Sequence, residues 1–473
     1  MLFTSYKYAL FAGIAFCVYY LATRLSRGRS VQNLALLGLS YLFYAFWDWR
    51  WCLLLLGVTA TGFMAGILLT RSRVNRRWIL VLALLTNLGA LGAFKYFGFF
   101  AGSFASLMRG FGLHADWATL NLVLPVGLSY YVFQNLSYVI DVYRRDTIPT
   151  TGAVEYATAL SFFPQLLAGP ITRPRDLLPQ LLERRTFDDD RARDGLRQIL
   201  WGLTKKMLVA DSIGSQVNHV WANVGQVDGL TLAISAVLYS FQIYCDFSGY
   251  ADIAIGTAKI FNLRLSGNFD YPYFSTSVRS FWRRWHITLA GWMRDYLYIP
   301  LGGSRTGAFR GVLNLLITFL VVGLWHGANW TFVVWGLLHG SFLAIERIFR
   351  RGDPKTDGKE RGAWMSILDA AIVFALVTFA WVFFRAPSLE AAIAYLGRGL
   401  RVPFDAVEHA RYVPVLALSA GLLVYERFMR RREHGLSISG LPPAARWAVY
   451  LAICMALLLF GHLGGREGIY VQF

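Results

Sequence analysis

The chain has 473 residues, of which 56% are hydrophobic, 16% aromatic and 16% charged, with a mean hydropathy of +0.44. A soluble domain carries about a quarter charged residues, so this composition excludes a soluble globular protein. The formal net charge of +18 does not indicate a nucleic-acid partner, because the basic residues stand in short clusters between hydrophobic runs.

Four hydrophobic runs occupy the first 107 residues, at positions 8–23, 31–47, 51–70 and 78–100. Each approaches the length of about 20 apolar residues that crosses a bilayer as a helix. The first run lacks a basic start and a small-residue cleavage site, so we expect a retained helix and not a signal peptide. Two runs separate the basic clusters at 24–29 and 71–77, which places both clusters on one side. The positive-inside rule makes this side the cytoplasm, with the N-terminus outside.

From position 121 onwards the hydrophobic runs are shorter and are interrupted by residues that break helices. The interruptions are Pro125, Pro164, Gly169, Pro170, Pro174 and Pro179. Irregular backbone at membrane depth is tolerated only where protein or water satisfies it, so these breaks predict re-entrant segments around a polar interior. The polar stretches 173–197 and 350–361 are expected in the cytoplasm, and the second precedes a C-terminal bundle of about three spans.

Cysteine usage indicates neither a metal site nor a disulfide framework. Cys17, Cys52, Cys245 and Cys454 all lie inside apolar runs, without the spacing of metal ligands. We expect them to be buried as small hydrophobic side chains.

The segment 280–305 combines aromatic and basic residues in a way that the other runs do not. Its large apolar residues, from Phe281 to Tyr296, recur at helical spacing, while Arg283, Arg284 and other charged residues populate a second face. Two structures fit this pattern: a helix lying in the membrane interface, or a re-entrant helix that lines a site. Periodicity alone favours the interfacial helix, which leaves His286 as a mere candidate at the edge of the apolar stripe.

His326 stands at the end of a strongly apolar run, between Gly323 and Gly327. Ionisable groups inside a membrane are expensive, so this histidine is a candidate functional residue. The alternative is a histidine that simply bonds to a neighbouring helix, and the residues leave both open. His339, further along, is interpreted as a packing or interfacial residue.

Asp246 and Asp252 lie in an otherwise apolar region and must find partners there. Structural ion pairs are the favoured interpretation, with the arginines near Arg283 as the simplest partners. The glycines at 302 and 303, followed by Arg305, can form a turn that binds phosphate, but a glycine pair more often ends a helix.

Several long motifs occur together in a fixed order. They are LPVGLSYYVFQNLSYVIDVYR at 124–144, FFPQLLAGPITRP at 162–174, YCDFSGYADIAIG at 244–256, FWRRWHITLAGWMRDYLYIPLGG at 281–303, LWHGANWTFVVWGLLHG at 324–340 and IYVQF at the C-terminus. With them the chain resembles, almost from end to end, the membrane-bound O-acyltransferase family and, within it, the alginate O-acetyltransferase branch. Glu467 and Gly468 depart from the more apolar tail expected there, which puts partner docking in doubt.

The resemblance implies an all-α integral membrane protein with about 11 transmembrane helices, plus re-entrant and interfacial helices that form a funnel or tunnel. It therefore favours the re-entrant alternative for segment 280–305. The whole chain 1–473 is expected to be one membrane domain, with scaffold helices at 1–107, a catalytic core at 121–349 and C-terminal helices at 362–473.

The resemblance also implies roles for individual residues. His326 matches the family's membrane histidine and His286 its second polar position, so both are predicted to be catalytic. Residues predicted to bind substrate or donor are Arg283, Arg284, Arg305, Trp285, Trp325, Asn329, Asp246 and Asp252. A thioester is already activated, so we expect acetyl-CoA as donor and neither metal nor cofactor. In this scheme His326 is the base, His286 orients the acceptor or donates to the oxyanion, and the arginines attract the donor's phosphates.

The function expected from these roles is transfer of an acetyl group across a bacterial inner membrane. The acceptor would be a periplasmic or membrane-tethered partner that completes O-acetylation of an exported polysaccharide such as alginate. Enzymatic alternatives are acetylation of peptidoglycan or cellulose, or D-alanyl transfer from a carrier protein toward teichoic acid. A proton-coupled transporter is disfavoured, because the sequence lacks a ladder of membrane carboxylates.

Overall fold

The computed structural model describes residues 1–25, 28–71, 75–112, 123–167, 169–305, 307–349, 362–399, 408–461 and 468–469. Within these ranges the regular structure consists of helices, and no strand occurs. The all-α prediction is thereby confirmed. Two compact units are present, Met1–Leu196 with Ala254–Ser266, and Arg197–Ile253 with Gly267–Ile469.

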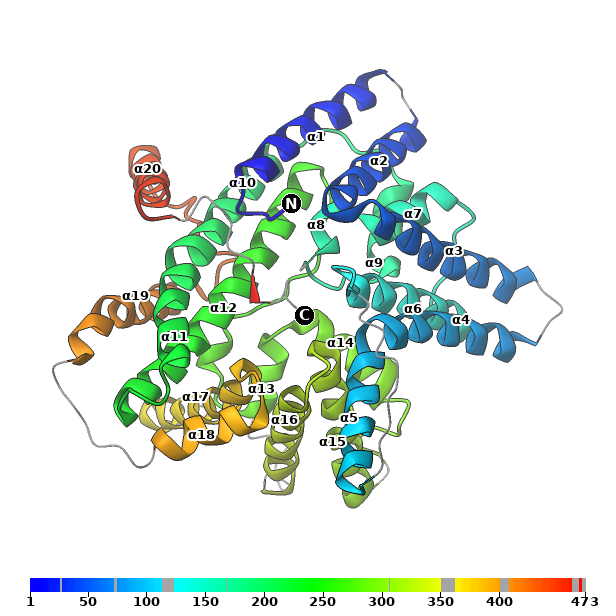
Figure 1. The fold of residues 1–473 in the computed structure, drawn as a ribbon. Coiled ribbons are helices and arrows are strands. Elements are labelled where there is room, and N and C mark those ends of the chain that lie inside the picture. Colours follow the sequence, from blue (N-terminus) through cyan, green and yellow to red (C-terminus); the bar gives the residue numbers. More distant parts are fainter. Residues whose placement is uncertain are drawn as a thin grey trace. The chain divides into compact units, whose positions relative to one another are not determined.

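The first unit contains the N-terminal helices (Figure 1). They are α1 (Tyr6–Leu25), α2 (Arg29–Asp48), α3 (Arg50–Arg71), α4 (Arg76–Leu91), α5 (Phe97–Gly110), α6 (Leu128–Arg144), α7 (Ala153–Ser161), α8 (Phe163–Leu166), α9 (Pro174–Leu182) and the start of α10 (Asp189–Leu203). A π-helical segment, Gly92–Tyr96, joins α4 to α5. The four predicted N-terminal helices are therefore present. The turn between α2 and α3 forms at Asp48, whose carboxylate accepts the Arg50 backbone N–H at 3.0 Å.

A buried asparagine holds three of these helices together, and α3, α4 and α6 lie side by side in Figure 1. Asn135 on α6 donates to the backbone oxygen of Val58 and to Asn87 Oδ1, both at 2.8 Å. Gly62 leaves room for this side chain, since a Cβ there would meet Asn135 Oδ1. Polar side chains between membrane helices bond to one another in this way, so Asn135 is a scaffold residue.

The second unit contains the remaining helices. They are the end of α10, α11 (Asp211–Ala222), most of α12 (Gly229–Ile260), α13 (Val278–Arg284), α14 (Ile287–Met293), α15 (Ala308–His326), α16 (Trp330–Phe349), α17 (Ala363–Arg385), α18 (Leu389–Gly399), α19 (Val413–Met429) and α20 (Pro443–Phe460). Two π-helical segments, Thr204–Ala210 and Arg294–Tyr298, interrupt the α-helical geometry.

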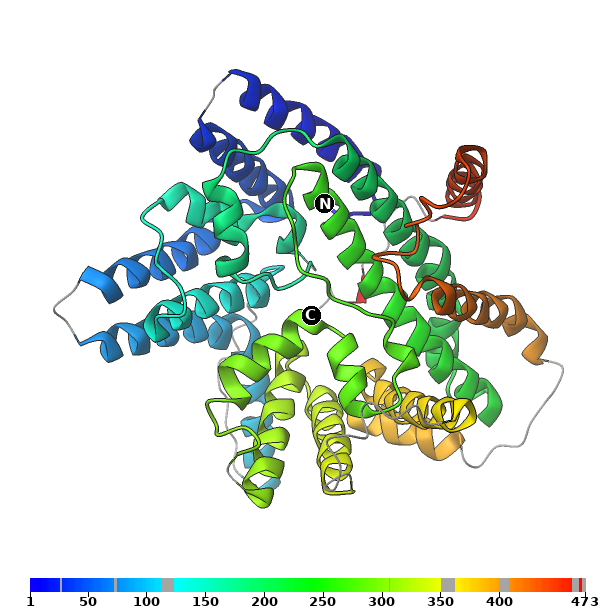
Figure 2. The ribbon, with the colours of Figure 1, turned by 180° about the vertical axis from the view of Figure 1, so that it is seen from behind.

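Helices α15 and α16 form a hairpin in which the two backbones almost touch (Figures 1 and 2). A Cβ added at Gly323 would lie 2.2 Å from the backbone oxygen of Phe332, and one at Gly336 would lie 2.2 Å from that of Phe319. Small residues permit this approach between membrane helices. The hairpin thus fixes the end of α15, where His326 stands.

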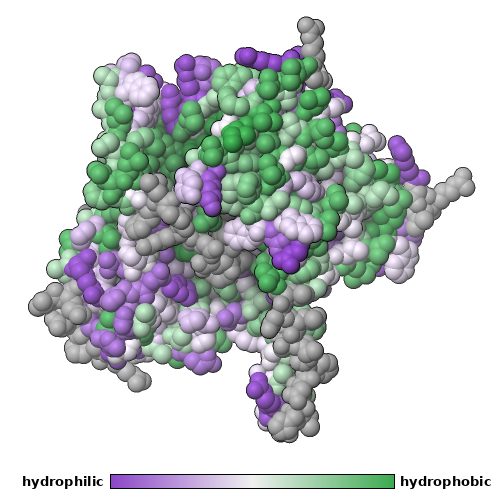
Figure 3. Space-filling model, turned by 45° about the horizontal axis from the view of Figure 1, so that its top comes forward, coloured by the Kyte–Doolittle hydropathy of each residue, from purple (hydrophilic) through white to green (hydrophobic). Residues whose placement is uncertain are grey.

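Within the described residues, nine helical stretches are long and apolar enough to cross a membrane. Hydrophobic residues cover much of the face shown in Figure 3, and hydrophilic residues gather in separate patches. The multi-pass membrane fold is confirmed, whereas the predicted count of about 11 spans is not. Helix α2 is not among the nine; its 20 residues include the buried polar side chains Gln32 and Asn33.

The prediction that all four cysteines are buried is wrong for three of them. Cys245 is buried, Cys52 is half-buried, and Cys17 and Cys454 are exposed on the protein surface. Cys454 lies on α20, and only 6% of the apolar stretch of this helix is buried inside the protein. Lipid is as apolar as a protein core, so hydropathy does not distinguish a lipid-facing cysteine from a packed one.

Candidate active site

The segment predicted as one continuous helical face is broken at its centre. Helix α13 ends at Arg284, Trp285 is extended, and His286 adopts the left-handed region at φ 44° before α14 begins. Histidine is among the non-glycine residues that tolerate this region best. The segment is therefore not the continuous interfacial helix that periodicity favoured.

The break at Trp285–His286 is held by the chain that precedes α13. The Asp270 backbone N–H donates to the Arg284 oxygen, and the Ile287 N–H donates to the Asn268 oxygen, both at 3.0 Å. At the other end of α13, Glu346 of α16 accepts the backbone N–H of Val278 at 2.8 Å. These bonds fix the position of His286 from both sides.

His286 is fully buried in the second unit. Its Nδ1 lies 3.1 Å from Asn268 Oδ1, and its ring meets the Phe247 ring edge-on, with centroids 4.7 Å apart. Burial lowers the pKa of His286 to about 3, because the charged form loses its hydration. The imidazole is consequently neutral at physiological pH.

His326 is the last residue of α15 and is 2% exposed. Aromatic rings of Trp325, Trp335 and Phe384 surround it, with centroids at 4.9, 5.0 and 5.2 Å. The His286 ring lies at 6.4 Å. The fold therefore brings together the two histidines that the sequence separates by 40 positions, 326 − 286.

His339 lies behind this pair on α16. Its Nδ1 accepts the indole N–H of Trp282 at 3.3 Å, and its ring meets Trp335 at 4.9 Å. Because Trp335 also meets His326, the hairpin, α13 and α17 enclose one aromatic cluster. His339 occupies a packing position in it.

The other predicted site residues divide into buried aromatics, a helix cap and surface arginines. Trp285 and Trp325 are buried, and Trp325 meets His286 at 5.7 Å. Asn329 caps α16, since its Oδ1 accepts the Thr331 N–H at 3.1 Å and its amide donates to the Pro387 oxygen at 3.0 Å.

The three arginines predicted to attract the donor's phosphates are Arg283, Arg284 and Arg305. Arg283 and Arg305 are exposed, whereas Arg284 is half-buried, 4.0 Å from Asp270. Gly302 and Gly303 both have positive φ and form a turn that ends the helical segment before them. Asn314 supports this turn by donating to the oxygens of Leu301 and Gly303, both at 3.1 Å.

Asp246 and Asp252 do form ion pairs, but the predicted arginine partners are wrong. Lys206 Nζ lies 2.7 Å from Asp246 Oδ1 and 2.7 Å from Asp211 Oδ1, and Lys205 Nζ lies 2.6 Å from Asp252 Oδ2. Both lysines stand on the π-helical segment Thr204–Ala210. Asp246 also accepts the backbone N–H of Ile469 at 2.7 Å, and Gly468 is buried against Tyr250. Glu467 lies outside the described residues.

Sequence reasoning missed Lys205, Lys206, Glu426 and Asn268. The first two are cations within the mostly apolar run 198–210, and the cost of burying such charges is a signal that could have identified them. Glu426 on α19 is 2% exposed and accepts the Tyr244 hydroxyl at 2.7 Å. Asn268 gave no signal, because it stands in a short polar segment.

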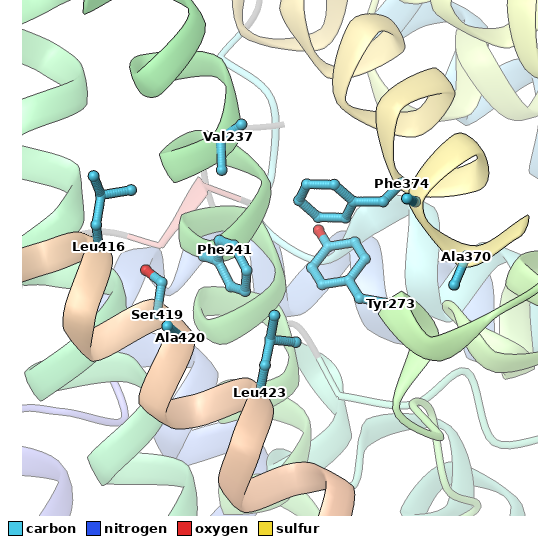
Figure 4. A pocket seen from close by; sticks show the side chains of 10 residues that line it. Val237, Phe241, Tyr273, Ala370, Phe374, Leu416, Ser419, Ala420 and Leu423 are labelled. Carbon is cyan, nitrogen blue, oxygen red and sulfur yellow. The ribbon is translucent and has the colours of Figure 1, made fainter. Parts of the chain in front are cut away.

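Apolar cavities occur elsewhere among the described residues of the second unit. One, of about 380 Å³, is lined by α12, α17 and α19, with Phe241, Tyr273, Phe374 and Leu423 pointing into it (Figure 4). The other, of about 470 Å³, lies between α12, α17 and α18. None of the predicted site residues lines either cavity.

The chain is similar in sequence to several known proteins. A family model, the membrane-bound O-acyltransferase family, matches residues 146–386, which include both histidines. The chain is 39% identical over 398 residues to the probable alginate O-acetylase AlgI of Pseudomonas aeruginosa, covering 83% of this chain and 73% of that protein. It is 33% identical over 414 residues to the peptidoglycan O-acetyltransferase of Helicobacter pylori, covering 82% and 77%.

A more distant match is the teichoic acid D-alanyltransferase of Bacillus subtilis, 25% identical over 278 residues and covering 56% of this chain and 69% of that protein. The family match spans the segments that carry His286 and His326. The chain therefore belongs to the membrane-bound O-acyltransferase family and is a multi-pass membrane O-acyltransferase.

Proposed function

We propose that this chain moves an acetyl group from cytoplasmic acetyl-CoA to a hydroxyl of a periplasmic or membrane-tethered partner protein. The partner then passes the group to an exported polysaccharide such as alginate. The observation that carries the proposal is the pair of buried imidazoles, His286 and His326, 6.4 Å apart at the end of α15 and the turn before α14.

The chemistry needs one base and a site for developing negative charge. A ring nitrogen of His326 takes the proton as the hydroxyl oxygen attacks the thioester carbonyl carbon. The C–S bond then breaks, and the proton passes to the departing thiolate, which leaves as the free thiol of CoA. His286 orients the hydroxyl or donates to the oxyanion. The thioester supplies the driving force, so the scheme uses no metal ion and no other cofactor.

The remaining predicted residues have supporting roles in this scheme. Arg283, Arg284 and Arg305 attract the phosphates of the donor, and two of them are exposed. Trp325 packs against both histidines, and Trp285 packs against Trp381. Asn329 fixes the start of α16, and Asp246 and Asp252 hold the π-helical segment against α12. We place the protein in the bacterial inner membrane with its N-terminus in the periplasm.

The choice of polymer rests on the names of the relatives. Alginate is supported by the 39% identity to the Pseudomonas protein, and peptidoglycan is the second candidate because of the 33% identity to the Helicobacter protein. Cellulose acetylation has no named relative among these, and D-alanyl transfer is supported only by the 25% match. A proton-coupled transporter is set aside, because the family consists of acyltransferases.

The test is transfer of radiolabel from acetyl-CoA to candidate acceptor proteins by the purified chain. His326→Ala should reduce the labelling rate by on the order of 100-fold or more, because a positioned base contributes 10² to 10⁴ in rate. His339→Gln is the matched control. It changes a buried histidine of the same hairpin that occupies a packing position, so this variant should retain the labelling rate. Labelling that survives in His326→Ala would overturn the proposal.

A further inference from the structure

The side chain of Asn268 has one possible orientation in this structure. It is 1% exposed, and its Oδ1 accepts the backbone N–H of Thr288 at 3.3 Å and the Thr288 hydroxyl at 2.9 Å. A backbone N–H can only donate, so the amide atom that faces it must be the oxygen and not the nitrogen. The hydrogen-bond network itself thus distinguishes the two ends of the amide.

The same oxygen decides where the proton of His286 lies. His286 Nδ1 is 3.1 Å from Asn268 Oδ1. A carboxamide oxygen only accepts, so Nδ1 must carry the hydrogen in this contact. A neutral imidazole has one N–H and one lone pair, which leaves the lone pair on Nε2. The burial of His286 favours this neutral form.

We infer that Asn268 is a positioning residue that holds His286 as the Nδ1–H tautomer, so that Nε2 accepts a hydrogen bond from the acceptor hydroxyl. Of the two roles proposed for His286, orienting the hydroxyl therefore holds, and donation to the oxyanion does not. The inference rests on the proposed function for its catalytic part, whereas the tautomer itself is a property of the resting protein.

The backbone strengthens this assignment. The Ile287 N–H donates to the Asn268 backbone oxygen at 3.0 Å. This bond holds the left-handed turn at His286 next to Asn268 without any help from the Asn268 side chain. Removing the amide alone leaves that bond in place. The substitution also removes the acceptor of the Thr288 N–H and hydroxyl, so the pH profile of Asn268→Asp, and not a loss of kcat in Asn268→Ala alone, reports on the imidazole.

The direct test is ¹⁵N NMR of the full-length protein in membranes with labelled histidine, measured without donor. The chain has eight histidines, and a His286→Asn spectrum identifies the resonances of His286. A protonated Nδ1 and an unprotonated Nε2 are expected. The reverse pattern would overturn the inference, and this measurement stays readable even if no acetyl transfer is found.

Two substitutions test the catalytic part. Asn268→Ala should lower kcat by on the order of tenfold to 100-fold, as loss of an orienting partner does, with KM for acetyl-CoA changed less than about twofold. Asn268→Asp keeps the accepting oxygen but adds a negative charge, which favours the imidazolium and places a proton on Nε2. Its kcat should be low near neutral pH and rise as pH increases, because His286 then loses that proton.

The matched control is Thr378→Val, which removes a buried hydroxyl of α17 that bonds to Ser240 at 2.9 Å. It should retain kcat while losing stability. An unchanged kcat in Asn268→Ala, or an Asn268→Asp variant without the rise at higher pH, would reduce Asn268 to a structural residue and contradict the inference.

Discussion

Lys206 is held by two buried carboxylates at once. Its ammonium lies 2.7 Å from both Asp211 and Asp246, and these three side chains are 2%, 5% and 2% exposed. A pair buried this deeply stabilises little by itself, because both partners lose their hydration. Removing one partner is different, since it leaves the other charge buried and uncompensated.

Lys206→Met should therefore lower the free energy of unfolding by about 3–5 kcal/mol. Lys259→Met is the control, because its partner Asp194 is 29% exposed. Water hydrates the Asp194 carboxylate when the lysine is removed, so the loss of stability should be smaller. Thermal unfolding of both variants in detergent measures the difference. Equal losses would show that the Lys206 network is solvated and that the burial argument fails.

For single residues, the sequence predicted which side chains need an ion-pair partner better than it predicted which residue that partner is. The cost of charge in an apolar region correctly indicated that Asp246 and Asp252 have partners. It did not identify them, because α11 separates Lys205 and Lys206 from these aspartates in the chain, and the lysines stand on a π-helical segment that no regular spacing predicts. His286 and His326 were found by motif, and their approach to 6.4 Å came from the fold.

Among the elements, the α15–α16 hairpin depends most directly on glycine. A Cβ at Gly323 would lie 2.2 Å from the Phe332 oxygen, a backbone atom that cannot move aside without displacing α16. His326 follows three residues later on the same helix. Packing at Gly323 therefore controls the position of the imidazole.

Gly323→Ala should cost about 1–3 kcal/mol, as overpacking does, and should also reduce acetyl transfer. Gly421→Ala on α19 offers the comparison, because a Cβ there meets nothing within 4 Å. It should be neutral or stabilising by up to about 1 kcal/mol. Thermal unfolding and the labelling assay, run on both variants, separate the two cases; a Gly323 variant as stable as the Gly421 variant would refute the close contact.

Element boundaries were predictable where a side chain or a long apolar run sets them. The four N-terminal helices follow from run length, and Asp48 marks the turn between α2 and α3. The break at His286 was not predictable, because neither glycine nor proline occurs there and the apolar spacing continues through it. Tertiary bonds from Asn268 and Asp270 override the local pattern.

For the whole molecule, composition predicts a protein that crosses the membrane several times. The nine candidate spans carry large apolar side chains on their outer faces, among them Leu10, Leu56, Leu82 and Leu451. Side chains of this kind face lipid in membrane proteins. What hydropathy left open is how many of the shorter, interrupted helices also cross the bilayer.

Orientation can be tested with single cysteines in a chain whose Cys17, Cys52, Cys245 and Cys454 are replaced by alanine. Trp49, 66% exposed between α2 and α3, is expected in the periplasm, and Arg77 at the start of α4 in the cytoplasm. A membrane-impermeant maleimide should label Trp49→Cys in cells with a permeabilised outer membrane. Arg77→Cys should react only after the inner membrane is opened. The reverse pattern would place the N-terminus in the cytoplasm.

The near-contact of the α15 and α16 backbones also has a consequence for motion. Two helices meet at Gly323 and Gly336 without intervening side chains, so we expect them to move as a single body that carries His326 and His339 together. His286 instead stands on a short turn between two seven-residue helices, tethered by a few hydrogen bonds. Since His326 is 2% exposed at rest, admission of a substrate requires opening, and we expect it to break the hydrogen bonds that hold the α13–α14 turn in the resting protein. Hydrogen exchange should accordingly be faster at that turn than along the hairpin.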